Sequence, residues 1–174
     1  ATSTATASLM HWLDCCEQNF AFRPLLELLK SVYFDALRVQ QAAVQALELA
    51  IHDSGTTSGL ARLMQLHDTA PALLKPLEAP ARRLAPGAGA RPAHYWCENL
   101  LESVQALPLW SQWQQDEAGR VLAQSLEDLH AALRRNGLRL AWADFRRLLE
   151  HTLERATFSG DNTSTGVRLL TLEQ

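Results

Sequence analysis

The chain has 174 residues, of which 47% are hydrophobic and 20% are charged, and its formal net charge is −3. This balance predicts a folded globular protein, excludes wholesale disorder, and gives no overall attraction to nucleic acid. No run of about 18 apolar residues is present, so we expect no membrane span. The odd count of three cysteines favours reduced thiols in a cytoplasmic protein over a disulfide framework.

Residues 1–84 have the apolar spacing of amphipathic helices and are expected to form an N-terminal helical half. The expected elements are a helix capped by Ser8, an apolar helix with Pro24 at its first position, a long helix from about Asp35 to Asp53 that ends at Gly55, and a helix capped by Ser58. Prolines and glycines are then dense up to residue 92, which excludes a long helix and predicts a flexible linker at 85–92.

A C-terminal helical half is expected at 93–158. Its long helix is capped by Asp116 and ended by Gly137, and its last helix starts near Trp142. Residues 159–174 are expected to be a polar loop and a terminal strand. That strand is apolar on both faces, as in a buried parallel sheet, and no partner strand is evident in the chain. The predicted fold class is therefore all-α, a multi-helix bundle-like domain with a short C-terminal β segment.

No catalytic, cofactor-binding or metal-binding set is evident. The six histidines lack the i, i+4 spacing of metal ligands, and no glycine-rich phosphate loop ending in lysine is present. Adjacent carboxylates on a helix diverge and do not converge on a substrate.

Arginines near the expected end of the long helix are the one indication of binding, since guanidinium groups suit phosphates. The pattern itself favours a solvated face, in which Arg134 and Arg135 suit the dipole of their helix end and Glu150 and Glu154 pair with the arginines of the last helix. The candidate nucleic-acid contacts are Arg134, Arg135, Arg139, Arg146 and Arg147.

Four segments carry a resemblance to a known family. They are the terminal strand with Val167, Leu169, Leu170, Thr171 and Leu172, the leucine-rich run at 22–31, the run at 46–51 followed by Gly59-Leu60-Ala61, and the stretch from Trp142 to Phe158. In this order they resemble bacterial DNA-repair helicase–nucleases of the RecB/AddB type, which are superfamily-1 helicases. The terminal strand resembles their motif V, and the rest resembles the helical insertion before it.

The resemblance implies a non-catalytic helical accessory subdomain of a DNA-repair helicase/exonuclease, which positions DNA and couples it to the motor domain. ATP and Mg²⁺ would bind elsewhere in the parent protein, if its motor is active. The implied partners are the rest of the parent chain, DNA through the parent, and a partner subunit. The alternative is a helical protein–protein interaction or scaffold module of an inactivated helicase-like protein.

Overall fold

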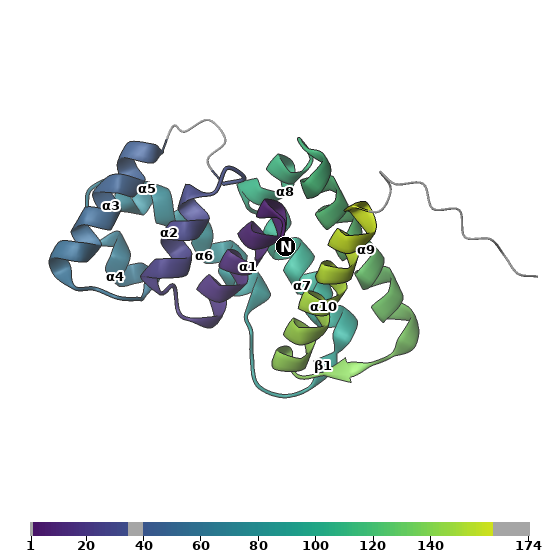
Figure 1. The fold of residues 1–174 in the computed structure, drawn as a ribbon. Helices are drawn as coiled ribbons and strands as arrows, with labels where there is room; N and C mark the ends of the chain where they lie inside the picture. The colour runs from purple at the N-terminus through teal and green to yellow at the C-terminus, as the bar shows by residue number, and fades with distance from the viewer. Residues whose placement is uncertain (1, 35–39, 162–174) are drawn as a thin grey trace, which may run out of the picture.

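The computed structural model of the chain describes residues 2–34 and 40–161. Over these residues the chain is almost entirely helical, which confirms the all-α class (Figure 1). In chain order the elements are α1 (Thr4–Glu17), α2 (Phe22–Lys30), α3 (Gln41–Ser54), α4 (Leu60–Met64), α5 (Ala70–Leu74), the 3-10 helix η1 (Lys75–Leu77), α6 (Glu78–Leu84), β1 (Arg91–Pro92), α7 (Ala93–Gln105), α8 (Pro108–Trp113), α9 (Glu117–Asn136), β2 (Arg139–Leu140) and α10 (Trp142–Asp161).

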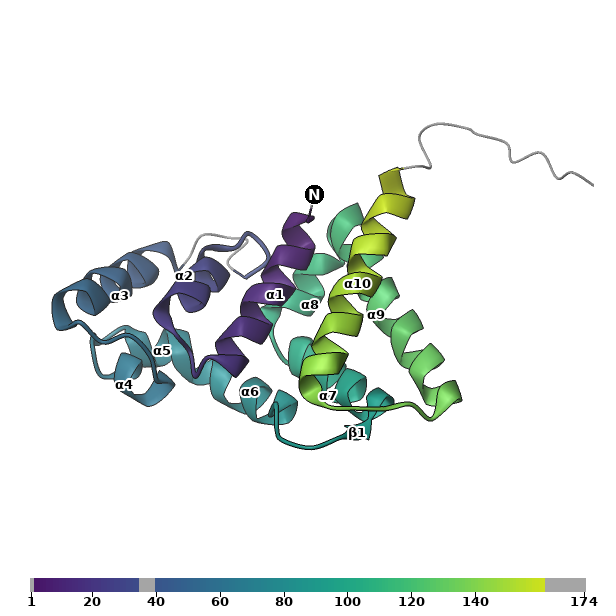
Figure 2. The ribbon, with the colours of Figure 1, turned by 60° about the horizontal axis from the view of Figure 1, so that its bottom comes forward.

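The helices form an elongated body in which α1 occupies the middle (Figures 1 and 2). Helices α2 to α5 lie at one end and α7 to α10 at the other, and α1 contacts α2 on one side and α8 and α9 on the other. The expected linker at 85–92 lies between α6 and α7, which pack directly on each other. Residues from both sides of it belong to one hydrophobic core.

Two buried serines fix α1 to the C-terminal helices. The indole nitrogen of Trp12 donates to Ser103 Oγ at 2.9 Å, and that hydroxyl donates to the Pro80 carbonyl at 2.7 Å. The indole nitrogen of Trp113 donates to Ser8 Oγ at 3.0 Å. Because each buried donor has a partner, these contacts allow tryptophans to pack in the core without an unsatisfied polar atom.

Three helix ends agree with the sequence-based expectations. The Asp116 carboxylate accepts from the Gly119 amide at 2.7 Å and caps α9. Gly55 and Gly137 adopt the left-handed conformation, with φ of 69° and 62°, directly after α3 and α9. Gly119 also has a packing role, since a Cβ there would collide with the Trp113 backbone.

Other helix starts differ from the expectation. Helix α1 begins earlier than predicted, with Ser3 as its cap, and Ser8 is buried inside it. Helix α4 follows Gly59 with no side-chain cap, so the predicted cap at Ser58 is wrong. Helix α2 begins at Phe22, so Pro24 is its third residue. Helices α2 and α4 thus begin without a side-chain cap, whereas the Ser3 hydroxyl caps α1 by accepting from the Thr6 amide.

At its C-terminal end α10 continues to Asp161, past the expected start of the polar loop at 159. The expected terminal strand, with Val167, Leu169, Leu170, Thr171 and Leu172, lies outside the described residues. In the part of the chain that the structure describes, no helix has both the length and the apolar character needed to cross a membrane.

Candidate functional site

A two-stranded antiparallel ribbon lies at the edge of the C-terminal helices where α7 and α10 begin (Figures 1 and 2). Strand β1 pairs with β2 with Arg91 opposite Leu140, and the Ala93 amide donates to the Leu138 carbonyl at 2.7 Å. Trp96 of α7 holds the ribbon in place, since its indole nitrogen donates to the Leu140 carbonyl at 2.8 Å. The segments before α7 and after α9 are thus held side by side.

Arginines gather on this ribbon. Arg139 lies on β2 and donates to the Ala90 carbonyl at 3.1 Å, and Arg91 lies on β1. Arg134 and Arg135 are exposed in the last turn of α9, which leads through Gly137 into β2. The ring of Tyr95, in the first turn of α7, lies 5.9 Å from the Arg91 guanidinium carbon. We call the surface formed by Arg91, Tyr95, Arg134, Arg135, Leu138 and Arg139 the ribbon end.

Among the described residues, the arginines of the ribbon end lack counter-charges, in contrast to Arg146 and Arg147 of α10. Within residues 2–34 and 40–161, none of the four ribbon-end arginines forms an ion pair with a carboxylate. Arg134 and Arg135 lie in the last turn of α9, where the negative end of the helix dipole stabilises their positive charges. Their guanidinium groups nevertheless remain open to solvent and to an anionic ligand.

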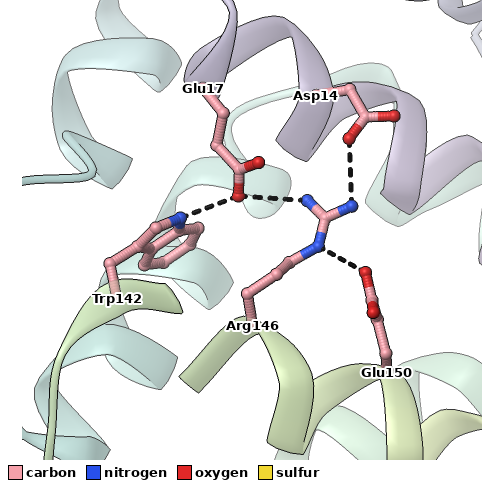
Figure 3. Close-up of polar contacts among 5 residues, drawn as sticks. All are labelled: Asp14, Glu17, Trp142, Arg146 and Glu150. Atoms are coloured by element: carbon pink, nitrogen blue, oxygen red, sulfur yellow. Dashed lines mark hydrogen bonds and ion pairs between the residues drawn. The ribbon is translucent and has the colours of Figure 1, made fainter. Parts of the chain in front are cut away.

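The predicted contact residue Arg146 has the opposite environment (Figure 3). Its guanidinium donates to Asp14 at 3.0 Å, to Glu17 at 3.2 Å and to Glu150 at 2.8 Å, and only 14% of its side chain is exposed. Glu17 Oε1 also accepts from the indole nitrogen of Trp142 at 2.7 Å. We call these five residues the Arg146 clamp, since they join α10 to α1.

The clamp is a structural ion-pair network. Burial alone lowers the pKa of Arg146, but the hydrogen bond to Glu150 and the charges of Glu17 and Asp14 outweigh it, so the net pKa is raised. Each of the three guanidinium nitrogens of Arg146 donates to a carboxylate. These donor groups are therefore used inside the fold.

Arg147, the neighbour of Arg146, is 76% exposed and donates to Asp144 at 2.7 Å. The structure therefore separates the five predicted contacts into two groups. Arg134, Arg135 and Arg139 share the ribbon end, whereas Arg146 and Arg147 are ion-paired on α10. The expected pair of Arg146 with Glu150 is present, and the acidic neighbour of Arg147 is Asp144 rather than Glu154.

A line of aromatic rings joins the two groups. Trp96, which holds β2, meets Trp142 edge to face at a centroid distance of 5.5 Å. Trp142 in turn donates to Glu17 in the clamp. The ribbon end, α10 and α1 are therefore connected through buried, well-packed side chains.

No reactive centre is evident elsewhere in the described residues. Burial raises the pKa of the Cys97 thiol to about 12, and burial with the nearby Glu17 charge raises that of Cys16 to about 12, so both thiols are poor nucleophiles. No group of three or more histidine, cysteine or acidic side chains in these ranges could hold a metal ion.

Sequence reasoning missed Tyr95 and assigned Arg91 to a flexible segment. Their place at the ribbon end follows from the pairing of β1 with β2, across a separation of about 49 residues. Two-residue strands carry no periodicity, so no local signal could have identified this pairing.

Neither protein-family models, nor curated proteins, nor solved structures provide a match to this chain.

Proposed function

We propose that this chain is a non-catalytic helical accessory subdomain of a RecB/AddB-type DNA-repair helicase/exonuclease. Its role is to position DNA and to couple DNA engagement to the motor domain. ATP and Mg²⁺ bind in the motor of the parent protein, if that motor is active, and the assembly works in the bacterial cytoplasm. The resemblance in the sequence segments described above supports the assignment to this family.

The observation that carries the DNA-binding part is the ribbon end. Four arginines without carboxylate partners in the described residues gather there, although the chain as a whole is acidic. Such a local concentration of guanidinium groups favours phosphate backbones through bidentate hydrogen bonds and counterion release. It supports contact with DNA at Arg134, Arg135 and Arg139, while the pairing of Arg146 and Arg147 assigns them to the fold.

The coupling part is supported by the packed connection from the ribbon end to α10. Trp96, Trp142 and the Arg146 clamp hold α10 against α7 and α1. In the proposed parent, α10 leads toward the motif V-like strand. A force exerted by DNA on the ribbon end would therefore move the helices as one rigid body and reach the motor through α10.

The test is DNA binding by the 174-residue chain, measured by fluorescence anisotropy at low salt. The triple variant Arg134→Glu, Arg135→Glu and Arg139→Glu is expected to lose affinity by about 100-fold or more, because phosphate contacts are lost and repulsion is gained. The control variant Arg23→Glu, Arg62→Glu and Arg82→Glu has the same net charge and should bind much more tightly than the first. Equal affinity of the two variants would refute the proposal.

An interaction or scaffold module is the second candidate. It is favoured by exposed apolar side chains near α2 and α3, since Val32 and Leu49 are each 65% exposed. Two grooves lie between α2 and α3. One, of about 420 Å³, is lined by Leu29 and Val44, and the other, of about 350 Å³, is lined by Phe22 and Ile51. Val32 lines the larger of the two grooves, and an exposed apolar side chain beside a groove is typical of protein-binding surfaces.

The two candidates predict different outcomes for matched variants. If the ribbon-end triple variant keeps DNA affinity and a Leu49→Asp variant loses binding to the partner subunit, the scaffold function is supported. If the ribbon-end variant loses DNA and Leu49→Asp binds DNA normally, the DNA-positioning function is supported. Both variants alter exposed residues, so thermal unfolding should stay close to that of the unmodified chain.

A further inference from the structure

Tyr95 is a large aromatic residue that lies outside the hydrophobic core. Its side chain is 42% exposed in the first turn of α7, although most aromatic rings of this protein are buried. The ring meets Trp96 at a centroid distance of 5.4 Å and an angle of 65°. Trp96 is itself fixed by its hydrogen bond to the Leu140 carbonyl. Tyr95 is therefore a solvent-facing ring supported from inside the protein.

The surroundings of Tyr95 combine charge with apolar surface. The Arg91 guanidinium lies over the ring, 5.9 Å from its centroid, and Arg139 lies on the paired strand. Leu138, between α9 and β2, is 43% exposed. An arginine beside an exposed ring is the combination that holds unstacked bases, because the ring and the guanidinium plane both present flat faces while the charge attracts phosphate.

We propose that the ribbon end binds single-stranded DNA, with a base stacked on Tyr95 and the adjoining phosphates held by Arg91, Arg134, Arg135 and Arg139. This inference rests on the proposed function and specifies its substrate. Single strands are favoured over duplex because the base faces of a duplex are already covered by neighbouring base pairs and cannot reach the ring. Stacking also makes recognition tolerant of sequence, since every base has a flat face.

The probe is a fluorescein-labelled oligothymidine of about 20 nucleotides, compared with a duplex of the same length. Tyr95→Ala is expected to weaken binding of the single strand by about 5-fold or more, and Tyr95→Phe, which keeps the ring, by less than about 2-fold. Duplex binding should change little in either variant. Arg91→Ala should weaken single-strand binding, whereas the matched control Arg23→Ala, which removes a guanidinium 5.8 Å from the Phe22 ring, should not.

The outcomes separate this inference from the proposed function. If the ribbon-end triple variant loses DNA but Tyr95→Ala binds the single strand normally, stacking on Tyr95 is refuted and the proposed function stands. If Tyr95→Phe loses as much affinity as Tyr95→Ala, the hydroxyl rather than the ring is responsible, and the inference also fails. If the unmodified chain binds neither DNA form at low salt, the proposed function itself fails.

A second measurement uses the unmodified chain, so it does not require any variant to fold correctly. A bromodeoxyuridine-substituted single strand is photo-crosslinked to the unmodified chain, and the crosslinked peptide is identified by mass spectrometry. We expect the crosslink in the peptide that carries Tyr95. Crosslinks confined to peptides from α2 and α3 would overturn the inference.

Discussion

The ribbon end and the Arg146 clamp contain arginines that lie close together in the sequence, yet their environments are opposite. At the ribbon end Arg134 and Arg135 face solvent without carboxylate partners in the described residues. In the clamp Arg146 is surrounded by Asp14, Glu17 and Glu150. The difference lies in whether another helix brings acidic side chains to the arginine. An arginine cluster in a sequence therefore indicates binding only where the fold supplies no such counter-charge.

The largest effect on folding should come from breaking the clamp. Arg146→Ala leaves three carboxylates close together without a cation, and we expect the free energy of unfolding to fall by about 2 kcal/mol. This value is below that for a fully buried pair, since the carboxylates are partly exposed and screened by solvent. Urea denaturation monitored by circular dichroism measures it.

Arg147→Ala is the matched control for the clamp. The Arg147 side chain is 76% exposed and pairs only with Asp144, so its loss should change the free energy of unfolding by about 0.5 kcal/mol or less. If Arg147→Ala destabilised the protein as much as Arg146→Ala, the division between the two arginine environments would be wrong.

The salt dependence of DNA binding should sharpen the comparison further. Replacing one phosphate-binding arginine, as in Arg134→Gln, is expected to reduce the slope of log affinity against log salt by about one. Arg147→Gln should leave the slope unchanged, because that guanidinium is paired with Asp144. Anisotropy titrations over a range of salt concentrations give both slopes. Equal reductions would place both arginines on the DNA.

Thiol reactivity offers the smallest but most local readout. Cys16 lies in α1 between Asp14 and Glu17, and burial together with the Glu17 charge raises its pKa to about 12. The folded state therefore favours the protonated thiol, and this contribution to stability is complete below the ordinary pKa of 9.0 and is lost as the pH rises toward 12. At pH values near neutrality, alkylation of Cys16 should accordingly be slow.

Breaking the clamp should accelerate that alkylation. In Arg146→Ala we expect Cys16 to react about threefold faster, because α10 no longer holds this part of α1. Cys97, which is buried in α7, serves as the internal reference and should not change. The ribbon-end triple variant should leave both rates unaltered, and acceleration of Cys16 there would contradict the local nature of the clamp.

The sequence predicted the helical class and several helix ends because those features depend on nearby residues. The apolar spacing defines the buried faces of the helices, Asp116 caps its own helix, and Gly55 and Gly137 end theirs through their backbone conformation.

The site could be predicted only in part because its environment is set by distant residues. Arg146 meets Asp14 and Glu17 across separations of 132 and 129 residues, which no local pattern encodes. The pairing of Arg146 with Glu150 was foreseen, since it is an i, i+4 contact within one helix. Tyr95 and its neighbour Arg91 lie beside Arg139 because two short strands pair.

The central claim is that DNA binds at the ribbon end and not at the clamp. The most direct measurement is an amide NMR titration of the nitrogen-15-labelled chain with single-stranded oligothymidine. The account predicts shifts concentrated at Arg91, Tyr95, Arg135 and Arg139, with Asp14 and Arg146 unmoved. Shifts centred on the clamp or on α2 and α3, or no shifts at low salt, would contradict it.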